Sequence, residues 1–422
     1  MTDYKTIFGK KIKFQTSDLT MSTATEGELF YSDTDSKFKV GVNLTAWASG
    51  GNLTGSSVYQ RTGFGIQTAA VAAGGTTNTA ASALVEEYDG SSWSEVNNIP
   101  AAKYDAGSFG TLTAGMVAGG LDNNTFYTTV QTEEYDGTNW TEGGDLPQGQ
   151  DEGNFLGILT AGLMAGGVGH PNPNAAYSGY AATTAEYDGS SWTAGNNLNT
   201  ARGASMCFGT QTAGLVAGGI PTSGNTELYD GTNWTEVGDL NTARAYGGSS
   251  RTAAQTAGVV FGGGTVNTEE WDGSSWTESG DLSTARHYVG SIGSQTAAMC
   301  LGGSQPPPAT AIVEEYNGSS WTSGTALMAA TQQIRASGNA SLALAYAGYN
   351  TTFAAQSYLW NDTTWITQPS LATGRSECAG CASGSSSTAA FACGGEVPAR
   401  VNTTENFTGE TTADTASTID FD

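Results

Sequence analysis

Short runs of alternating hydrophobic and polar residues, separated by glycine-rich turns, extend over most of the chain. Within residues 203–240, the runs GASMCFG and GLVAGG flank the turn GTQTA, and the runs TELYD and NWTEVGDL flank an Asp-Gly turn. Asp-Gly between aromatic-flanked strands is a strong hairpin signal. The pattern therefore predicts four short antiparallel strands, and no stretch has convincing helical periodicity.

This four-strand unit is repeated along the chain. Tryptophans recur 42–52 residues apart, at Trp47, Trp93, Trp140, Trp192, Trp234, Trp276, Trp321 and Trp365. The hairpin before them reads YDGSSW or YDGTNW in most copies, and a glycine pair lies upstream of each hairpin, from Gly74-Gly75 to the remnant Ala347-Gly348. Repetition of four strands at this period predicts an all-β fold, the β-propeller.

The repeat resembles the kelch family. In that family a glycine pair ends the second strand, a tyrosine lies on the third and a tryptophan on the fourth, and a small-residue stretch with arginine leads to the next blade. Here this stretch reads LNTAR (198–202 and 240–244), LSTAR (282–286) and LATGR (371–375). The resemblance covers residues 47 to about 409 and implies a kelch-like propeller. The five-residue step from tyrosine to tryptophan is shorter than is usual for kelch, so we expect a tightened hairpin.

The two ends of the repeat array predict how the ring closes. Trp47 has no glycine pair before it, and the unit with Gly394-Gly395 has no tryptophan after it. A strand at 46–53 would therefore complete the blade begun by residues 376–409 and leave no open sheet edge. We expect eight blades, closed by this N-terminal outer strand, or seven if one end unit lies outside the ring.

Charge divides the chain into two parts. The chain has 40 Asp and Glu against 15 Lys and Arg, a formal net charge of −25, which argues against binding to nucleic acid or to an anionic membrane surface. Six of the seven lysines fall within the first 39 residues, while residues 47–422 hold 34 acids and 9 bases. This composition break predicts an N-terminal arm at 1–45 and a propeller at 46–422.

The N-terminal arm suggests a biological context. Residues 10–16, 28–32 and 37–42 are predicted to be short strands, too few to bury a core of their own. The segment ATEGELFYSDTDSKFKVGV (24–42) resembles the attachment segments of bacteriophage tail-fibre and other virion proteins. Together with this repeat style it resembles structural proteins of marine bacteriophages, particularly cyanophages.

The resemblance implies a virion location, after assembly in the host cytoplasm, and a tail-fibre or receptor-binding role. Residues 1–45 would dock to other virion proteins, while the propeller would meet a host surface glycan or protein, in a monomer or a homo-oligomer. A capsid-decorating or tail-scaffold protein without a receptor is an alternative. A carbohydrate-active propeller enzyme is an alternative of another class.

One face of the propeller carries the candidate ligand residues. Strand alternation places the second-to-third loops and the connections between blades on the same face, and loop insertions often mark a binding face. A sugar's C–H face packs on an aromatic ring, so the candidates are mainly aromatic and basic: Phe126, Tyr127, His170, Tyr177, Tyr180, Arg202, Arg244, Tyr246, Arg286, His287, Tyr349 and Arg375. The alternative is that the arginines bond carbonyls of a neighbouring blade and that the tyrosines anchor loops.

The sequence does not predict catalytic or cofactor chemistry. The two histidines lie on different blades, and the aspartates of the hairpins are turn residues. Cys378 and Cys381 are three positions apart, so in a strand their thiols point to opposite faces and are expected to be buried free thiols, not zinc ligands. We therefore expect no enzyme activity, no metal and no cofactor.

Overall fold

The structure is a computed structural model of the 422-residue chain. It describes residues 3–7, 10–15, 29–32, 37–40, 46–53, 61–66, 69–76, 80–89, 92–122, 128–151, 153–170, 179–250, 254–304, 308–338, 340–341, 343–350, 352–360, 365–368, 370–372, 374, 379–380, 389–393, 403–408 and 417–418.

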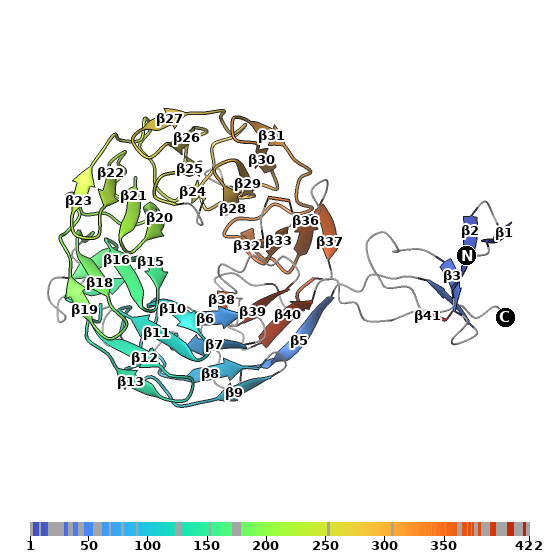
Figure 1. Ribbon diagram of the computed structural model, residues 1–422, viewed down its shortest axis with the longest axis horizontal. Coiled ribbons are helices and arrows are strands. Elements are labelled where there is room, and N and C mark those ends of the chain that lie inside the picture. The colour runs from blue at the N-terminus through green and yellow to red at the C-terminus, as the bar shows by residue number, and fades with distance from the viewer. Residues whose placement is uncertain are drawn as a thin grey trace. The chain divides into compact units, whose positions relative to one another are not determined.

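Seven four-stranded antiparallel sheets, each from one stretch of chain, follow one another around a ring (Figure 1). We number them as blades. Blade 1 has β6 (Thr62–Ile66), β7 (Ala69–Ala73), β8 (Val85–Tyr88) and β9 (Trp93–Glu95). Blade 2 has β10 (Gly107–Thr111), β11 (Ala114–Ala118), β12 (Thr132–Tyr135) and β13 (Trp140–Glu142). Blade 3 has β15 (Asn154–Ile158), β16 (Ala161–Ala165), β18 (Thr184–Tyr187) and β19 (Trp192–Ala194).

The remaining blades have the same strand order. Blade 4 has β20 (Met206–Thr210), β21 (Ala213–Ala217), β22 (Thr226–Tyr229) and β23 (Trp234–Glu236). Blade 5 has β24 (Gly248–Ser249), β25 (Gly258–Phe261), β26 (Thr268–Trp271) and β27 (Trp276–Glu278). Blade 6 has β28 (Gly290–Ser294), β29 (Ala297–Leu301), β30 (Val313–Tyr316) and β31 (Trp321–Ser323). Blade 7 has β32 (Arg335–Gly338), β33 (Ala343–Tyr346), β36 (Ser357–Trp360) and β37 (Trp365–Gln368).

One further four-stranded sheet joins the two ends of the repeat array. This closing sheet contains β38 (Ala379–Gly380), β39 (Ala389–Cys393), β40 (Thr403–Thr408) and β5 (Ala46–Asn52). The strand expected at 46–53 therefore does complete the sheet formed by the last repeat, and this prediction is confirmed. The fold is an all-β β-propeller.

Repeated contacts between neighbouring blades explain why the same residues recur. In blades 4, 5 and 6 the tryptophan that begins the fourth strand donates its indole N–H to a threonine of the preceding blade, at 2.8 Å for Trp234 to Thr184, 2.8 Å for Trp276 to Thr226 and 2.7 Å for Trp321 to Thr268. The aromatic residue of the third strand stacks on the same tryptophan, with ring centroids 4.9 Å apart for Tyr229 and Trp234. The hairpin motif thus joins blades as well as strands.

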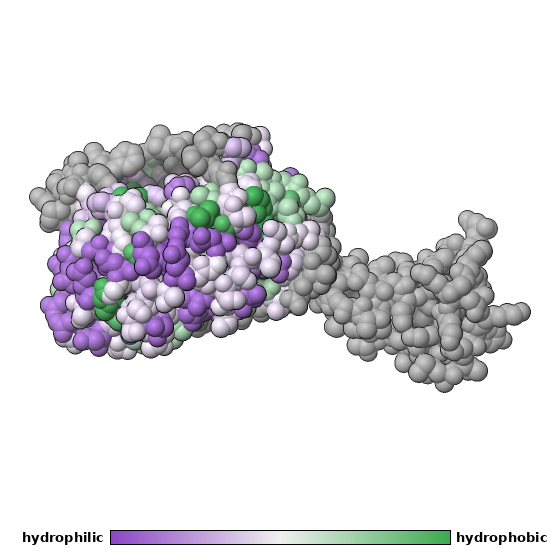
Figure 2. Space-filling view, turned by 90° about the horizontal axis from the view of Figure 1, so that it is seen from above, coloured by the Kyte–Doolittle hydropathy of each residue, from purple (hydrophilic) through white to green (hydrophobic). Residues whose placement is uncertain are grey.

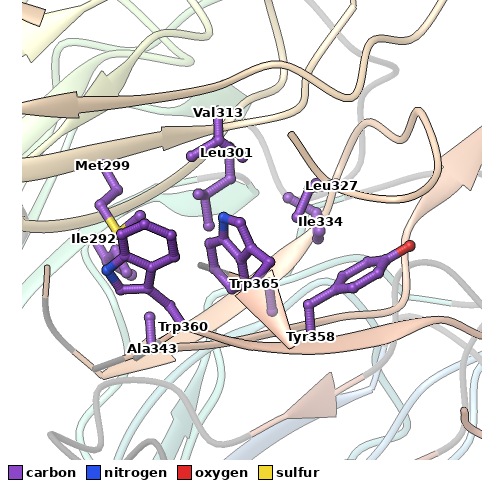
Figure 3. Close-up of a cluster of buried hydrophobic side chains, with 11 residues drawn as sticks. Ile292, Met299, Leu301, Val313, Leu327, Ile334, Ala343, Tyr358, Trp360 and Trp365 are labelled. Carbon is purple, nitrogen blue, oxygen red and sulfur yellow. The ribbon is translucent and has the colours of Figure 1, made fainter. Parts of the chain in front are cut away.

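The hydrophobic core lies between the blades. Figure 3 shows one such cluster, in which Trp360 and Trp365 of blade 7 pack beside Met299, Leu301 and Val313 of blade 6. Similar clusters join the other neighbouring blades that the structure describes. Because each blade is buried by its neighbours, repetition around the ring takes the place of a single central core.

The chain divides into two compact units, Ser49–Asn406 and a smaller unit made of Met1–Ala48 and Phe407–Asp422. The smaller unit contains a five-stranded sheet in the order β1 (Asp3–Ile7), β2 (Lys10–Gln15), β3 (Leu29–Ser32), β4 (Lys37–Val40) and β41 (Ser417–Thr418). The predicted strands at 10–16, 28–32 and 37–42 correspond to β2, β3 and β4. The expected division into 1–45 and 46–422 differs from these units in two respects: the smaller unit extends to Ala48, and it includes the last residues of the chain, where β41 pairs with β4.

Candidate functional site

The connections between blades and the second-to-third loops lie together on one face, as the strand alternation predicts. Backbone bridges join the two kinds of segment in four places: Tyr104 to Leu121, Gly203 to Ile220, His287 to Ser304 and Gln332 to Tyr349. The connection between blades 2 and 3 is joined to its loop by two short strands, β14 (Gly149–Asp151) and β17 (Val168–His170), and the loop of blade 7 has a pairing of its own, β34 (Tyr349–Asn350) with β35 (Thr352–Phe353). We call this side of the propeller the connector face.

The repeated arginines are not on the surface of this face. Arg202, Arg244 and Arg286 are each 0% exposed and form ion pairs with Glu227, Glu269 and Glu314. Arg202 also donates hydrogen bonds to the backbone oxygens of Thr200, Gly218 and Asn225. Their assignment to the ligand face was therefore wrong. The arginines bond backbone carbonyls, as the structural alternative held, together with a buried glutamate that the sequence analysis did not foresee.

The same buried pair occurs with other basic residues in the first two blades. Arg61 lies 3.1 Å from Glu86, and the Lys103 ammonium lies 2.6 Å from Glu133. Burial raises the pKa of the Glu133 carboxyl and lowers that of the Lys103 ammonium, although each attracts the other. Desolvation at this pair is thus the largest influence on both groups, which is typical of an ion pair taken out of water.

Two blades lack the pair because both partners are replaced. Gln150 and Ala185 occupy the positions in blade 3, and Thr331 and Tyr358 occupy them in blade 7. Removing one partner alone would leave a buried charge without compensation, which is strongly destabilising, whereas replacing both can be nearly neutral. The substitutions occur together, as this physical argument requires.

Two of the exposed large apolar side chains lie side by side on the connector face. Tyr246 and Tyr288 are 39% and 43% exposed, and their ring centroids are 5.0 Å apart at an interplanar angle of 40°. Tyr246 was predicted as a ligand residue, and its exposure is consistent with that assignment. Elsewhere the side of the propeller in Figure 2 is mostly purple and white, with green confined to limited areas.

The two tyrosines are held by the backbone of the connections between blades. Ala204, Tyr246, Tyr288 and Gln333 occupy the same repeat position and all have a positive φ of 50–58°. Backbone hydrogen bonds link these positions: the amide of Tyr246 donates to Ala204 O at 3.4 Å, that of Tyr288 to Tyr246 O at 3.3 Å, and that of Gln333 to Tyr288 O at 3.0 Å. This chain of hydrogen bonds runs from blade to blade and orients the exposed side chains.

The remaining described candidates are more enclosed. His287 is half-buried, exchanges two 2.8 Å backbone hydrogen bonds with Ser304, and has its ring 6.1 Å from that of Tyr288. Tyr349 is half-buried and exchanges 2.9 Å backbone hydrogen bonds with Gln332. Tyr180 is half-buried, and its ring lies against Gly203, where an added Cβ would come within 2.9 Å of it.

Several predicted residues are not placed by the structure. Phe126, Tyr127, Tyr177 and Arg375 lie outside the described residues, and for His170 the structure describes only the backbone, which pairs with Gly149. Cys378 and Cys381 also lie outside the described residues. Of the cysteines that are described, Cys207 and Cys300 are free thiols, and burial raises the pKa of the Cys300 thiol to about 12.

Sequence reasoning missed two exposed residues of the connector face, Gln333 and Arg335. Gln333 has the same repeat position as Tyr246 and Tyr288, and alignment of the repeats could have identified it. Arg335 stands where blades 1 to 6 have Thr62, Gly107, Asn154, Met206, Gly248 and Gly290. The signal for Arg335 was that it differs from the residues at its repeat position, and a search for recurring residues does not detect such a difference.

The turn acids have a structural role. Asp272 accepts hydrogen bonds from the backbone amides of Ser274 and Ser275, both at 2.8 Å, and these bonds lower its pKa to about 2. Among the described residues there is no group of three or more His, Cys, Asp or Glu side chains that could hold a metal ion. A helix long and apolar enough to cross a membrane is likewise not found in the described part of the chain.

Comparison with known proteins adds little to this description. No protein-family model matches the chain, and no curated protein matches it. The chain is similar to a solved structure titled "Structure of YjhT", with 14% sequence identity and a TM-score of 0.43, over 64% of this chain and 99% of that chain. The assignment to the β-propeller fold rests on the strand pairing described above.

Proposed function

We propose that this protein is a structural component of a bacteriophage particle, of the tail-fibre or receptor-binding kind. Residues 1–45 dock it to other virion proteins, and the connector face of the propeller meets the host surface. The virion context comes from the resemblance of residues 24–42 to phage attachment segments.

The observation that carries the host-surface role is the exposed Tyr246–Tyr288 pair. The arginines that precede the two tyrosines, Arg244 and Arg286, form buried ion pairs, whereas the two aromatic rings are in contact with solvent. Tyrosine supplies a large contact area at a small loss of conformational entropy, and it is enriched where proteins bind partners. A connection held by hydrogen bonds from blade to blade presents the rings in a fixed arrangement, which lowers the entropic cost of binding.

We also infer that the ring is of the kelch type and has eight blades, with the closing sheet as the eighth. The pairing of β5 with the strands of the last repeat supports this count. The glycine pairs support the kelch type. Gly218 and Gly219 have φ values of 64° and 117°, and a Cβ on Gly218 would lie 2.5 Å from the Arg244 carbonyl oxygen of the next connection. Only glycine fits there without strain.

Imaging of purified particles labelled with an antibody against the propeller tests the proposal. We expect label at the tail. Label on the head would favour the capsid-decorating alternative, and unlabelled particles that also lack the protein by mass spectrometry would contradict a virion role. Release of shorter products from oligosaccharides by the purified protein would instead favour the enzyme alternative.

A further inference from the structure

Among the described residues of the propeller, all but one of the positively charged side chains are in buried ion pairs. Residues 47–422 contain nine bases, and the structure describes the side chains of six. Five of these are in buried ion pairs: Arg61, Lys103, Arg202, Arg244 and Arg286. The sixth, Arg335, is exposed and forms no ion pair with the described residues. In a domain this acidic, an exposed and uncompensated cation is an exception.

Arg335 lies at the connector-face end of the inner strand of blade 7. It is the first residue of β32 and pairs with Tyr346, which directly precedes Ala347-Gly348. It follows Gln333 by two residues, so the two Cα atoms are at most roughly 7 Å apart. The Gln333 amide in turn donates a 3.0 Å hydrogen bond to the carbonyl oxygen of Tyr288. The connection that carries Arg335 is therefore hydrogen-bonded, two residues before Arg335, to the connection that carries Tyr288.

The connection that carries Arg335 is firmly anchored. Leu327 and Ile334 are 3% and 6% exposed and belong to the cluster between blades 6 and 7 (Figure 3). Ile334 therefore points into the core, while Gln333 and Arg335 on either side of it are exposed. Packing thus fixes the backbone that carries the Arg335 side chain, so that little conformational entropy is lost when a ligand binds.

We propose that Arg335, together with Tyr246 and Tyr288, forms a subsite for an acidic saccharide, one that carries a carboxylate or a sulfate. This inference rests on the proposed function and specifies its ligand. A guanidinium donates paired hydrogen bonds to a carboxylate or sulfate, and such charge-assisted bonds are stronger than neutral ones. The C–H face of a neighbouring sugar ring packs on the tyrosines. The guanidinium recognises the acidic group and the tyrosine pair recognises the sugar ring, so both are needed to bind an acidic saccharide.

The net charge of the protein does not prevent this binding. At about 0.15 M ionic strength the Debye length is roughly 8 Å, so acids on distant blades are largely screened from a bound anion. The guanidinium acts at contact distance, where screening is weak. The surrounding acids repel every anion, so an anion that does not also pack on the tyrosine pair binds weakly. The site is therefore expected to be selective for acidic saccharides over simple anions.

Binding of matched oligosaccharides to the full-length protein tests the inference. The probes are an oligogalacturonate, a sulfated dextran oligosaccharide and a neutral dextran oligosaccharide of similar length. We expect at least one acidic probe to bind about tenfold or more tightly than the neutral one, as a charge-assisted contact requires. The two acidic probes distinguish carboxylate from sulfate recognition.

Three variants separate the contributions. Arg335→Gln should reduce binding of the acidic probe to the level of the neutral one, and Arg335→Lys should retain part of the preference. Tyr288→Ala should weaken binding of every probe. The control is Glu278→Gln at an exposed site of β27, which changes the net charge by one unit in the opposite direction and should leave the order of the probes unchanged.

The outcomes are distinguishable. Equal binding of the acidic probe by wild type and Arg335→Gln, or no preference of the wild type for either acidic probe, overturns the inference. If the Tyr288→Ala variant still loses binding to host cells in that case, the proposed function stands without an acidic ligand. If labelled particles lack the protein, the proposed function fails independently of the saccharide result.

Discussion

Buried ion pairs beneath the connector face are the most costly contacts to disturb singly. Glu227→Ala would leave the Arg202 guanidinium, which is 0% exposed, without its counter-charge. We expect a loss of about 3–5 kcal/mol in the free energy of unfolding, measured as a lower midpoint in thermal or urea denaturation.

The chain itself supplies the matched control for this substitution. Blade 3 has Gln150 and Ala185 where blade 4 has Arg202 and Glu227. The double variant Arg202→Gln with Glu227→Ala should therefore be less destabilised than Glu227→Ala alone. If the double variant is destabilised by the sum of both single changes, the two residues do not act as a pair.

Backbone strain at the connections between blades predicts a substitution that stabilises the protein. Ala204 has a φ of 50°, a conformation that costs a residue with a Cβ roughly 1–2 kcal/mol. Ala204→Gly should therefore raise the free energy of unfolding, by about 0.5–1 kcal/mol after the entropy that glycine gains in the unfolded chain. Ala194→Gly, at an exposed position of β19, should lower it. Changes of the same sign at both sites would show that strain at residue 204 has no part in stability.

Hairpin turns give the protein a specific response to acid. Backbone amides donate to the carboxylates of Asp136, Asp188, Asp230 and Asp272 and lower their pKa values, to about 2 for Asp272. The unfolded chain, with pKa values near 3.8, binds more protons between about pH 2 and 4. Stability contributed by these turns is therefore present above pH 4 and is lost as the pH falls towards 2.

Replacing these four aspartates by asparagine should flatten the pH dependence of the thermal midpoint between pH 4 and 2. The turn itself should persist, because Asn317 makes the same turn in blade 6 and accepts 3.0 Å hydrogen bonds from the amides of Ser319 and Ser320. The control replaces four exposed fourth-strand glutamates by glutamine: Glu95, Glu142, Glu236 and Glu278. If this control flattens the curve equally, net charge and not the turn bonds determines the response.

Recurrence along the chain made the elements predictable. The hairpin tryptophans recur because each packs on the aromatic residue of its own third strand, and in blades 4, 5 and 6 it also donates an indole hydrogen bond to the preceding blade, as Trp234 does to Thr184. The pairing of β41 with β4 could not be predicted in this way, because it joins two ends of the chain that have no repeat in common.

Recurrence misled the prediction of the site. Arg202, Arg244 and Arg286 recur for a structural reason, namely a buried ion pair that blades 4, 5 and 6 have in common. Tyr246 and Tyr288, which share a repeat position, are exposed, and so is Arg335, which has no counterpart among the repeats. Without knowing which side chains are buried, the sequence could not separate an arginine that stabilises a blade from one that faces solvent.

At the scale of the whole molecule, the propeller is a rigid support for a small number of exposed side chains. Its ionic groups stabilise the ring and its turns, and few large apolar residues remain exposed in the described part: Ile158, Tyr246, Tyr288 and Met328. Two of the four form the stacked pair on the connector face. The account therefore assigns recognition to that face and stability to the repeat.

Binding of the purified, fluorescently labelled protein to cells of the host bacterium tests this assignment most directly. Ile158 ends β15 at its turn into β16, on the side opposite the connector face, and is 64% exposed, so Ile158→Ala serves as the control. We predict that Tyr246→Ala with Tyr288→Ala abolishes binding while the thermal midpoint stays near that of wild type, and that Ile158→Ala binds normally. Undiminished binding by the double tyrosine variant would contradict the account.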